Sequence, residues 1–152
     1  MVTGKTDEEY LRKGVSEYIE RIRRYLTFEY IEIPSLKNYS SLSPQQAMKK
    51  EAEVFQKYIS GGEILILLDE HGKQMRSVEF ARFLEQRMLS GIKSLVFLAG
   101  GPFGFHPDMK KQANDLIALS EMTFSHQMVR LIFTEQLYRA LTILRNESYH
   151  HE

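Results

Sequence analysis

The residues best suited to chemistry follow three apolar segments that read as buried strands. The glycine-rich loop Gly100–Gly104 follows Leu95–Ala99, the polar residues Asp69–His71 follow Ile64–Leu68, and Leu119–His126 forms a third such loop. Ligands of open α/β sheets bind outside the carboxyl ends of the strands, and glycines there let a ligand approach the backbone. We therefore expect the three loops to converge on one cleft. Such a cleft suits a flat, mostly neutral ligand such as an adenosine moiety.

Several other kinds of site are not favoured by these loops. The glycine loop lacks the Gly-Lys-Ser/Thr ending of a nucleotide-binding P-loop and the spacing of a dinucleotide fingerprint, and an ordinary tight turn is its alternative reading. Asp69 and Glu70 resemble magnesium ligands, but a solvated turn explains them at least as well. The sequence has no zinc motif and no nucleophile elbow, so we predict no metal.

The last third of the chain carries further polar residues with two readings each. His126 precedes an apolar segment and reads either as a hydrogen-bonded structural residue or as a base. Arg130 and Arg139 should each face a carboxylate or a phosphate, because an unpaired buried charge is costly. Glu135 and Arg139 are spaced to pair along a helix. Tyr149–His150 reads either as a frayed end or as a surface that stacks on bases.

Helical and strand patterns alternate along the chain and predict one α/β domain over residues 1–152. The expected helices cover residues 7–25, 43–59, 77–89, a segment opening at 107, and 127–144, and the expected strands cover 28–33, 64–68, 95–99 and 117–120. Ser43, with Pro44 and Gln46, predicts a capping box, and Ser77 is expected to cap the next helix.

Composition narrows the possible functions. The 152 residues include no cysteine, which suits the cytoplasm, and the longest apolar runs are too short to span a membrane. We also find no secretory leader at the N-terminus. The 20 basic and 20 acidic residues give zero net charge, which counts against binding nucleic acid through a broad basic field. An RNA enzyme of this composition would need a local patch, a surface built by two subunits or a large shaped partner.

The predicted last helix is apolar almost all round. A helix of this kind must be buried on more than one side. We predict that one side faces the sheet and another faces a second copy of the chain in a two-fold homodimer. A central helix within a monomer is the alternative.

Four segments together resemble one known family. They are Gly100–Gly104, the Met-Thr-Phe-x-His-Gln segment from Met122, the Glu-Gln-Leu-Tyr-Arg-Ala run from Glu135, and the ending from Tyr149. Their order and spacing are similar to those of the ribosomal RNA large-subunit methyltransferase H family. These small SPOUT-class enzymes methylate N3 of a pseudouridine in 23S ribosomal RNA on assembled ribosomes.

The resemblance implies a fold, a cofactor and site residues. The fold is a parallel sheet flanked by helices whose C-terminal part forms a trefoil knot, in an obligate dimer. S-adenosylmethionine would bind in the knot, against Leu68, Gly100, Leu119, Ser120, Glu121, Met122, Thr123 and Phe124. The residues near the RNA would be His126, Arg130, Arg139, Tyr149 and His150.

The chain departs from the family at its first strand, where only Met1-Val2-Thr3 precedes Gly4-Lys5. We therefore predict a shortened first strand and some loss of stability. The cofactor site is expected to survive.

The expected reaction is methyl transfer from S-adenosylmethionine, in which the protein mainly aligns the nucleophile. The sequence identifies no clear base for the N3 proton. His126 and Glu135 are candidates, as are the C-terminal histidines. Two alternatives remain at this point: a non-enzymatic ribosome- or RNA-binding module of the same fold, and a related methyltransferase with another substrate.

Overall fold

The computed structural model describes residues 1–151, so Glu152, the last residue of the predicted domain, lies outside it. Five parallel strands form one sheet. They are β1 (Val2–Thr3), β2 (Glu32–Ile33), β3 (Ile64–Gln74), β4 (Leu95–Ala99) and β5 (Asp115–Ala118), and their order in the sheet is β2-β1-β4-β3-β5.

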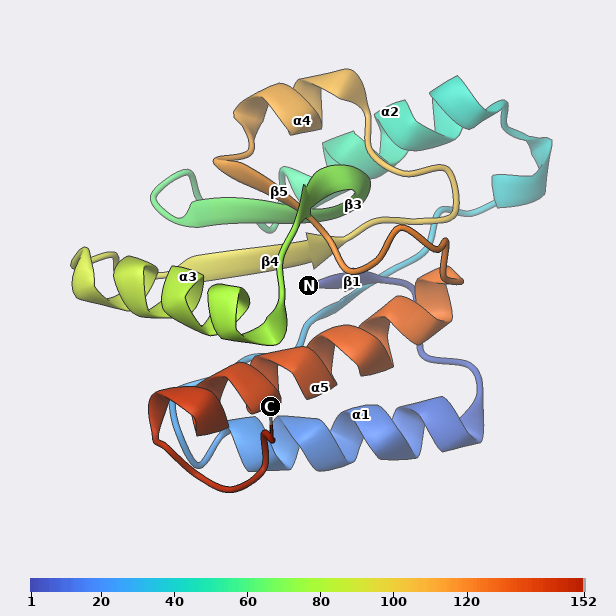
Figure 1. Cartoon of the computed structure of the whole chain (residues 1–152). Coiled ribbons are helices and arrows are strands. Elements are labelled where there is room, and N and C mark those ends of the chain that lie inside the picture. The colour runs from blue at the N-terminus through green and yellow to red at the C-terminus, as the bar shows by residue number, and fades with distance from the viewer. Residues whose placement is uncertain (152) are drawn as a thin grey trace.

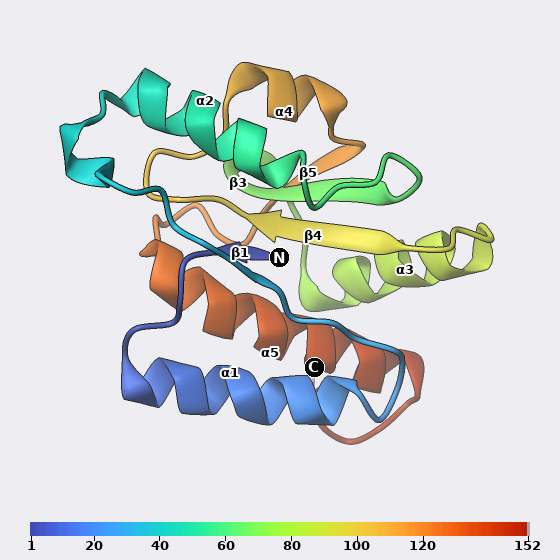
Figure 2. The same ribbon diagram turned by 180° about the vertical axis from the view of Figure 1, so that it is seen from behind.

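Helices cover both faces of the sheet: α1, α3 and α5 lie on one face, and α2 and α4 on the other (Figure 1; Figure 2, from behind). The helices are α1 (Glu9–Ile22), the 3₁₀ turn η1 (Tyr39–Ser41), α2 (Pro44–Phe55), α3 (Ser77–Leu89), α4 (Pro107–Gln112) and α5 (His126–Leu144). The predicted parallel sheet flanked by helices is confirmed.

The central strands are apolar because both of their faces are buried. In β3, Leu65 and Leu67 pack in one cluster with Phe55 of α2 and Met109 of α4. The intervening Ile66 belongs to a second cluster, formed with α3 and α5 on the opposite face. Successive side chains of a strand point to opposite faces, so a strand between two helical layers needs an unbroken apolar run.

The helix starts follow the sequence, with one exception. Ser43 and Gln46 form the predicted capping box: the Gln46 amide donates to the Ser43 hydroxyl at 3.3 Å and the Ser43 amide to Gln46 Oε1 at 3.0 Å. Ser77 does not cap α3, because its hydroxyl donates instead to Gln136 of α5 at 2.8 Å. The N-cap position is Arg76, whose amide donates to Glu79 at 2.8 Å.

Helix α5 lies between α1 and α3 beneath the sheet, and every one of its residues is buried or partly buried (Figure 1). The apolar sequence of α5 predicted burial on several sides, and α1, α3 and the sheet of the same protomer provide most of that burial. The homodimer stays a prediction. None of the helices that the structure describes is long and apolar enough to cross a bilayer.

The first strand is short, as predicted, because β1 has only two residues. The Met1 amine donates to the Phe97 carbonyl at 2.8 Å, and the Val2 amide donates to the Ile31 carbonyl at 2.9 Å. Beside Met1, an apolar groove of about 660 Å³ runs between residues 95–97 and 28–31. Residues 28–31 were expected to be part of a strand, but only Glu32–Ile33 pair with β1.

Candidate active site

A cavity of about 360 Å³ opens at the carboxyl ends of β4 and β5 and beside residues 68–71 of β3. The three segments that the sequence singled out all contribute to it, as predicted. Asp69–His71, however, do not form a loop after a strand that ends at Leu68, because β3 continues to Gln74 through an irregular stretch. Seven of the eight residues proposed to bind the cofactor line this cavity: Leu68, Gly100, Leu119, Ser120, Met122, Thr123 and Phe124. Glu121 is exposed and is not among the lining residues.

The glycine loop leaves little room for side chains at its first two positions. A Cβ built on Gly100 would lie 3.0 Å from the ring of Phe105. A Cβ built on Gly101 would lie only 2.4 Å from a carboxylate oxygen of Glu51, so that the buried Glu51 side chain would have to move. Glycine therefore lets the backbone pass close to both residues.

The irregular stretch of β3 after Leu68 brings an ion pair to the cavity. Asp69 is buried and accepts from the Lys110 ammonium at 2.7 Å and from the His71 amide at 3.0 Å. Burial raises the pKa of Asp69, but these hydrogen bonds outweigh it and hold the pKa below its usual range. The sequence left Asp69 open between a magnesium ligand and a residue of a solvated turn. Within residues 1–151, no group of three or more metal-binding side chains occurs.

The loop after β5 is tied to the irregular stretch of β3. The Thr123 hydroxyl donates to Glu70 at 3.4 Å, and the Met122 amide donates to the Ser120 hydroxyl at 2.9 Å. The Met122 side chain is 75% exposed at the mouth of the cavity. An apolar group at the mouth suits contact with a ligand that enters from solvent.

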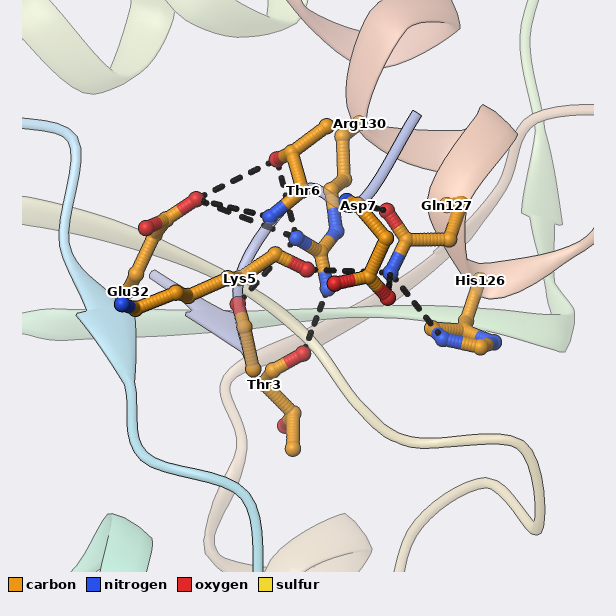
Figure 3. Close-up of polar contacts among 9 residues, drawn as sticks. Thr3, Lys5, Thr6, Asp7, Glu32, His126, Gln127 and Arg130 are labelled. Atoms are coloured by element: carbon orange, nitrogen blue, oxygen red, sulfur yellow. Dashed lines mark hydrogen bonds and ion pairs between the residues drawn. The ribbon is translucent and has the colours of Figure 1, made fainter. Parts of the chain in front are cut away.

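His126 is the first residue of α5, and its ring lines the cavity. Burial is the main cause that lowers its pKa, and the nearby Arg130 charge adds to this effect, while Asp7 opposes it. The neighbouring Gln127 donates to the Lys5 carbonyl at 3.0 Å and to Asp7 at 3.2 Å (Figure 3). The start of α5 is therefore fixed to the loop that follows β1.

Arg130 lies inside the protomer rather than on its surface, since it is only 2% exposed. Its guanidinium donates to the carbonyl oxygens of Thr3 and Gly4 and to the Thr6 hydroxyl, and it lies 4.0 Å from Glu32 (Figure 3). A carboxylate or a phosphate was expected opposite this arginine, but two backbone carbonyls and a hydroxyl accept its hydrogen bonds, and Glu32 lies too far away to accept one. Arg130 therefore positions the loop after β1.

A second polar cluster lies toward the other end of α5. Glu135 accepts from Arg139, from Gln136 at 2.8 Å and from the Tyr149 hydroxyl at 3.1 Å. The Arg139 guanidinium lies 4.7 Å from the centre of the Tyr149 ring and 3.5 Å from Nδ1 of His150. The structure thus brings together Arg139, Tyr149 and His150, as their proposed common role requires.

The two groups of predicted residues are separate within one protomer. His126 and Arg139 are thirteen residues apart on α5, which corresponds to roughly 20 Å along a helix. Neither Glu135 nor Arg139 is among the residues that line the cavity. Only His126 connects the predicted RNA contacts with the predicted cofactor site.

Comparison with known proteins agrees with this arrangement. A family model described as "Predicted SPOUT methyltransferase" matches residues 1–150. Proteins named "Ribosomal RNA large subunit methyltransferase H" from Bacteroides fragilis and Flavobacterium johnsoniae are each 49% identical to this chain, over 100% and 98% of it and 97% and 95% of their own lengths. The protein of that name from Porphyromonas gingivalis is 45% identical over all 152 residues. The chain therefore belongs to the SPOUT methyltransferases, in the ribosomal RNA large subunit methyltransferase H family.

Proposed function

We propose that this protein binds S-adenosylmethionine in the strand-end cavity and methylates N3 of a pseudouridine in 23S ribosomal RNA on the assembled ribosome. The observation that carries the proposal is the convergence of three segments, far apart in sequence, on one cavity. The curated relatives, whose names specify a ribosomal RNA methyltransferase, support the choice of substrate.

The cavity fits the proposed cofactor in size and chemistry. Its volume of about 360 Å³ lies within the range of small-molecule sites. Backbone groups of the glycine loop offer close approach to a flat ring. When bound, S-adenosylmethionine supplies a sulfonium methyl group that is already activated. The protein then contributes alignment and the exclusion of water.

Of the candidate bases, His126 is the best placed, since neither Glu135 nor the C-terminal histidines are among the residues that line the cavity. Its ring lines the cavity, and its lowered pKa leaves it neutral near pH 7 and able to accept a proton. The carboxylate of Glu135 is occupied by Arg139, Gln136 and Tyr149. We assign Glu135 the role of holding Arg139 and Tyr149 in place.

The RNA-facing surface is proposed to combine His126 with Arg139, Tyr149 and His150, while Arg130 acts indirectly through the loop after β1. Since roughly 20 Å of helix separates the two groups, one protomer does not present them together. A two-fold homodimer with antiparallel α5 helices would place one protomer's Arg139 cluster near its partner's cavity. This geometry supports the homodimer more strongly than the apolar character of α5 does.

We further infer that residues 1–152 act as one domain in the cytoplasm, where ribosomes are available, and that its C-terminal part is threaded as a trefoil knot. These inferences rest on the family to which the chain belongs. A zero net charge is compatible with an RNA substrate if the protein recognises the shape of the ribosome. Binding then does not depend on a broad basic surface.

The test is methyl transfer to defined RNA substrates. Purified protein and isotopically labelled S-adenosylmethionine are incubated with unmodified 70S ribosomes, 50S subunits or free 23S RNA, and the nucleosides are identified by mass spectrometry. We expect label on a pseudouridine from 70S ribosomes and a loss of at least 100-fold in rate for His126→Ala. Cofactor binding without transfer to any RNA would favour the non-enzymatic module. Label on another nucleotide or RNA would favour the related methyltransferase.

A further inference from the structure

A buried carboxyl group lies behind the glycine loop, outside the cavity itself. Glu51 of α2 is 2% exposed, and neither of its carboxylate oxygens has a hydrogen-bond partner among residues 1–151. Taking a carboxylate out of water is costly unless hydrogen bonds replace its hydration. Since Glu51 lies away from the candidate catalytic residues, its costly burial needs another explanation.

The carboxyl group packs directly on the backbone of Gly101. From the position of a Cβ on Gly101, Oε1 of Glu51 is 2.4 Å away and Oε2 is 2.9 Å away. Burial raises the pKa of Glu51 to about 7, and the adjoining Gly101 amide acts in the opposite direction by favouring the carboxylate. The Gly101 amide, although it does not reach ordinary hydrogen-bond geometry, is therefore the group best placed to donate to this carboxylate.

A second buried polar group belongs to a residue that contacts the same loop. The Tyr39 hydroxyl, from η1, has no partner within the described part of the chain, and its ring stacks on Phe103 with centroids 5.6 Å apart. Burial, and then the charge of Glu51, raise the pKa of Tyr39 to about 12. Glu51 thus contacts the loop at Gly101 and Tyr39 contacts it at Phe103, while Gly101 and Phe103 also line the cavity.

We propose that Glu51 is a positioning residue whose carboxylate holds the Gly101 amide and so fixes loop 100–104 in the conformation that receives S-adenosylmethionine. This role rests on the proposed function. If the ionised form is the one that holds the loop, cofactor affinity should fall as Glu51 takes up a proton. From η1, Tyr39 is the titratable group that faces it. Five other titratable side chains line the cavity instead: Asp69, Glu70, His71, Lys110 and His126. His106, just after the loop, faces Asp108 at 3.4 Å.

The experiment compares cofactor binding by the full-length protein, Glu51→Gln and Glu53→Gln between pH 5.5 and 8.5. Glu53 is the matched control, because it lies on the same helix with an exposed side chain. S-adenosylhomocysteine is titrated alongside S-adenosylmethionine by calorimetry, since it lacks the sulfonium charge. We expect the wild-type affinity for both ligands to fall about tenfold from pH 8 to pH 6, as protonation of one group with a pKa near 7 requires. Glu53→Gln should match it.

Glu51→Gln should bind both ligands at least tenfold more weakly at pH 8 and should lose the step near pH 7 that the wild type shows. Any remaining pH dependence in this variant belongs to the cavity histidines. Wild-type affinity and pH profile in Glu51→Gln would overturn the role. A pH step near 7 that appears with S-adenosylmethionine but not with S-adenosylhomocysteine would also overturn the role, because it would indicate a direct effect of the Glu51 charge on the sulfonium. If Glu51→Gln does not fold, the wild type alone tests the proposal, and a wild-type affinity that does not change near pH 7 overturns the role of Glu51. A wild type that binds neither ligand overturns the proposed function first.

Discussion

The guanidinium of Arg130, on the last helix, donates to the carbonyl oxygen of Gly4 at 3.1 Å. These residues lie 126 positions apart, and the bond ties α5 to the loop between β1 and α1. The same loop is held at Lys5 and Asp7 by Gln127 (Figure 3). The first residues of the chain thereby fix the start of the helix that carries His126.

Replacing Arg130 by Met should destabilise the protein. The variant keeps the length of the side chain but leaves the carbonyls of Thr3 and Gly4 without their donor, which costs on the order of 2–4 kcal/mol in the free energy of unfolding. Urea denaturation measures this loss. Arg24→Met, at an exposed position, is the control and should change stability by less than about 0.5 kcal/mol. Equal stability of the two variants would contradict the role given to Arg130.

Replacing Gly100 by Val should abolish cofactor binding. The first carbon alone would lie 3.0 Å from the Phe105 ring, and the remaining atoms would occupy the cavity. We expect at least a 100-fold loss of affinity by calorimetry. Gly62→Ala is the control, because nothing lies within 4 Å of a Cβ there. Unchanged affinity in Gly100→Val would show that the cofactor binds elsewhere.

Replacing Arg139 by Ala should separate RNA recognition from cofactor binding. The residue lies outside the cavity, so affinity for S-adenosylmethionine should change less than twofold. Transfer to 70S ribosomes should fall at least tenfold in kcat/KM, because a cation stacked on Tyr149 is removed from the proposed RNA surface. An equal loss in both measurements would indicate damage to the fold instead.

Stability should depend on pH through Glu51. Its pKa is near 7 in the folded protein and 4.5 when unperturbed, so the folded state binds more protons between these values. The group therefore lowers the free energy of unfolding as pH rises from about 4.5 through 7, by roughly 3 kcal/mol at most. In thermal denaturation without cofactor, Glu51→Gln should lose this decline, and its gain over wild type should grow toward pH 8. A constant difference between the two proteins would argue against a titrating Glu51.

The groove beside Met1 tests the predicted loss of stability. Three apolar, β-branched residues added before Met1 would extend β1 between residues 95–97 and 28–31 and fill part of the 660 Å³ groove. After the cost of ordering them, the gain should be about 1–3 kcal/mol, or several degrees in Tm. A Gly-Ser-Gly extension of equal length is the control. No difference between the two extensions would show that the groove does not accept a strand.

The sequence predicted the features that depend on neighbouring residues. The apolar runs predicted β3 and β4, the Ser43 capping box predicted the start of α2, and the order of the loops predicted one cavity. Features that depend on distant partners were missed. Glu51 appears as one charge among several in a helix, and only the fold places it against Gly101, fifty residues away. Ser77 looks like a cap until Gln136 supplies its alternative partner.

The position of β1 has a consequence for how the chain acquires its structure. Met1 and Val2 bond to Ala99 and Ile31, so the first strand lies between two partners that are both synthesised after it. The N-terminal residues leave the ribosome first but cannot pair with β4 until nearly a hundred more residues have followed. Such long-range pairing is associated with slow folding. We expect the loop after β1, the start of α5 and the cavity between them to become ordered together in the last, rate-limiting phase of folding.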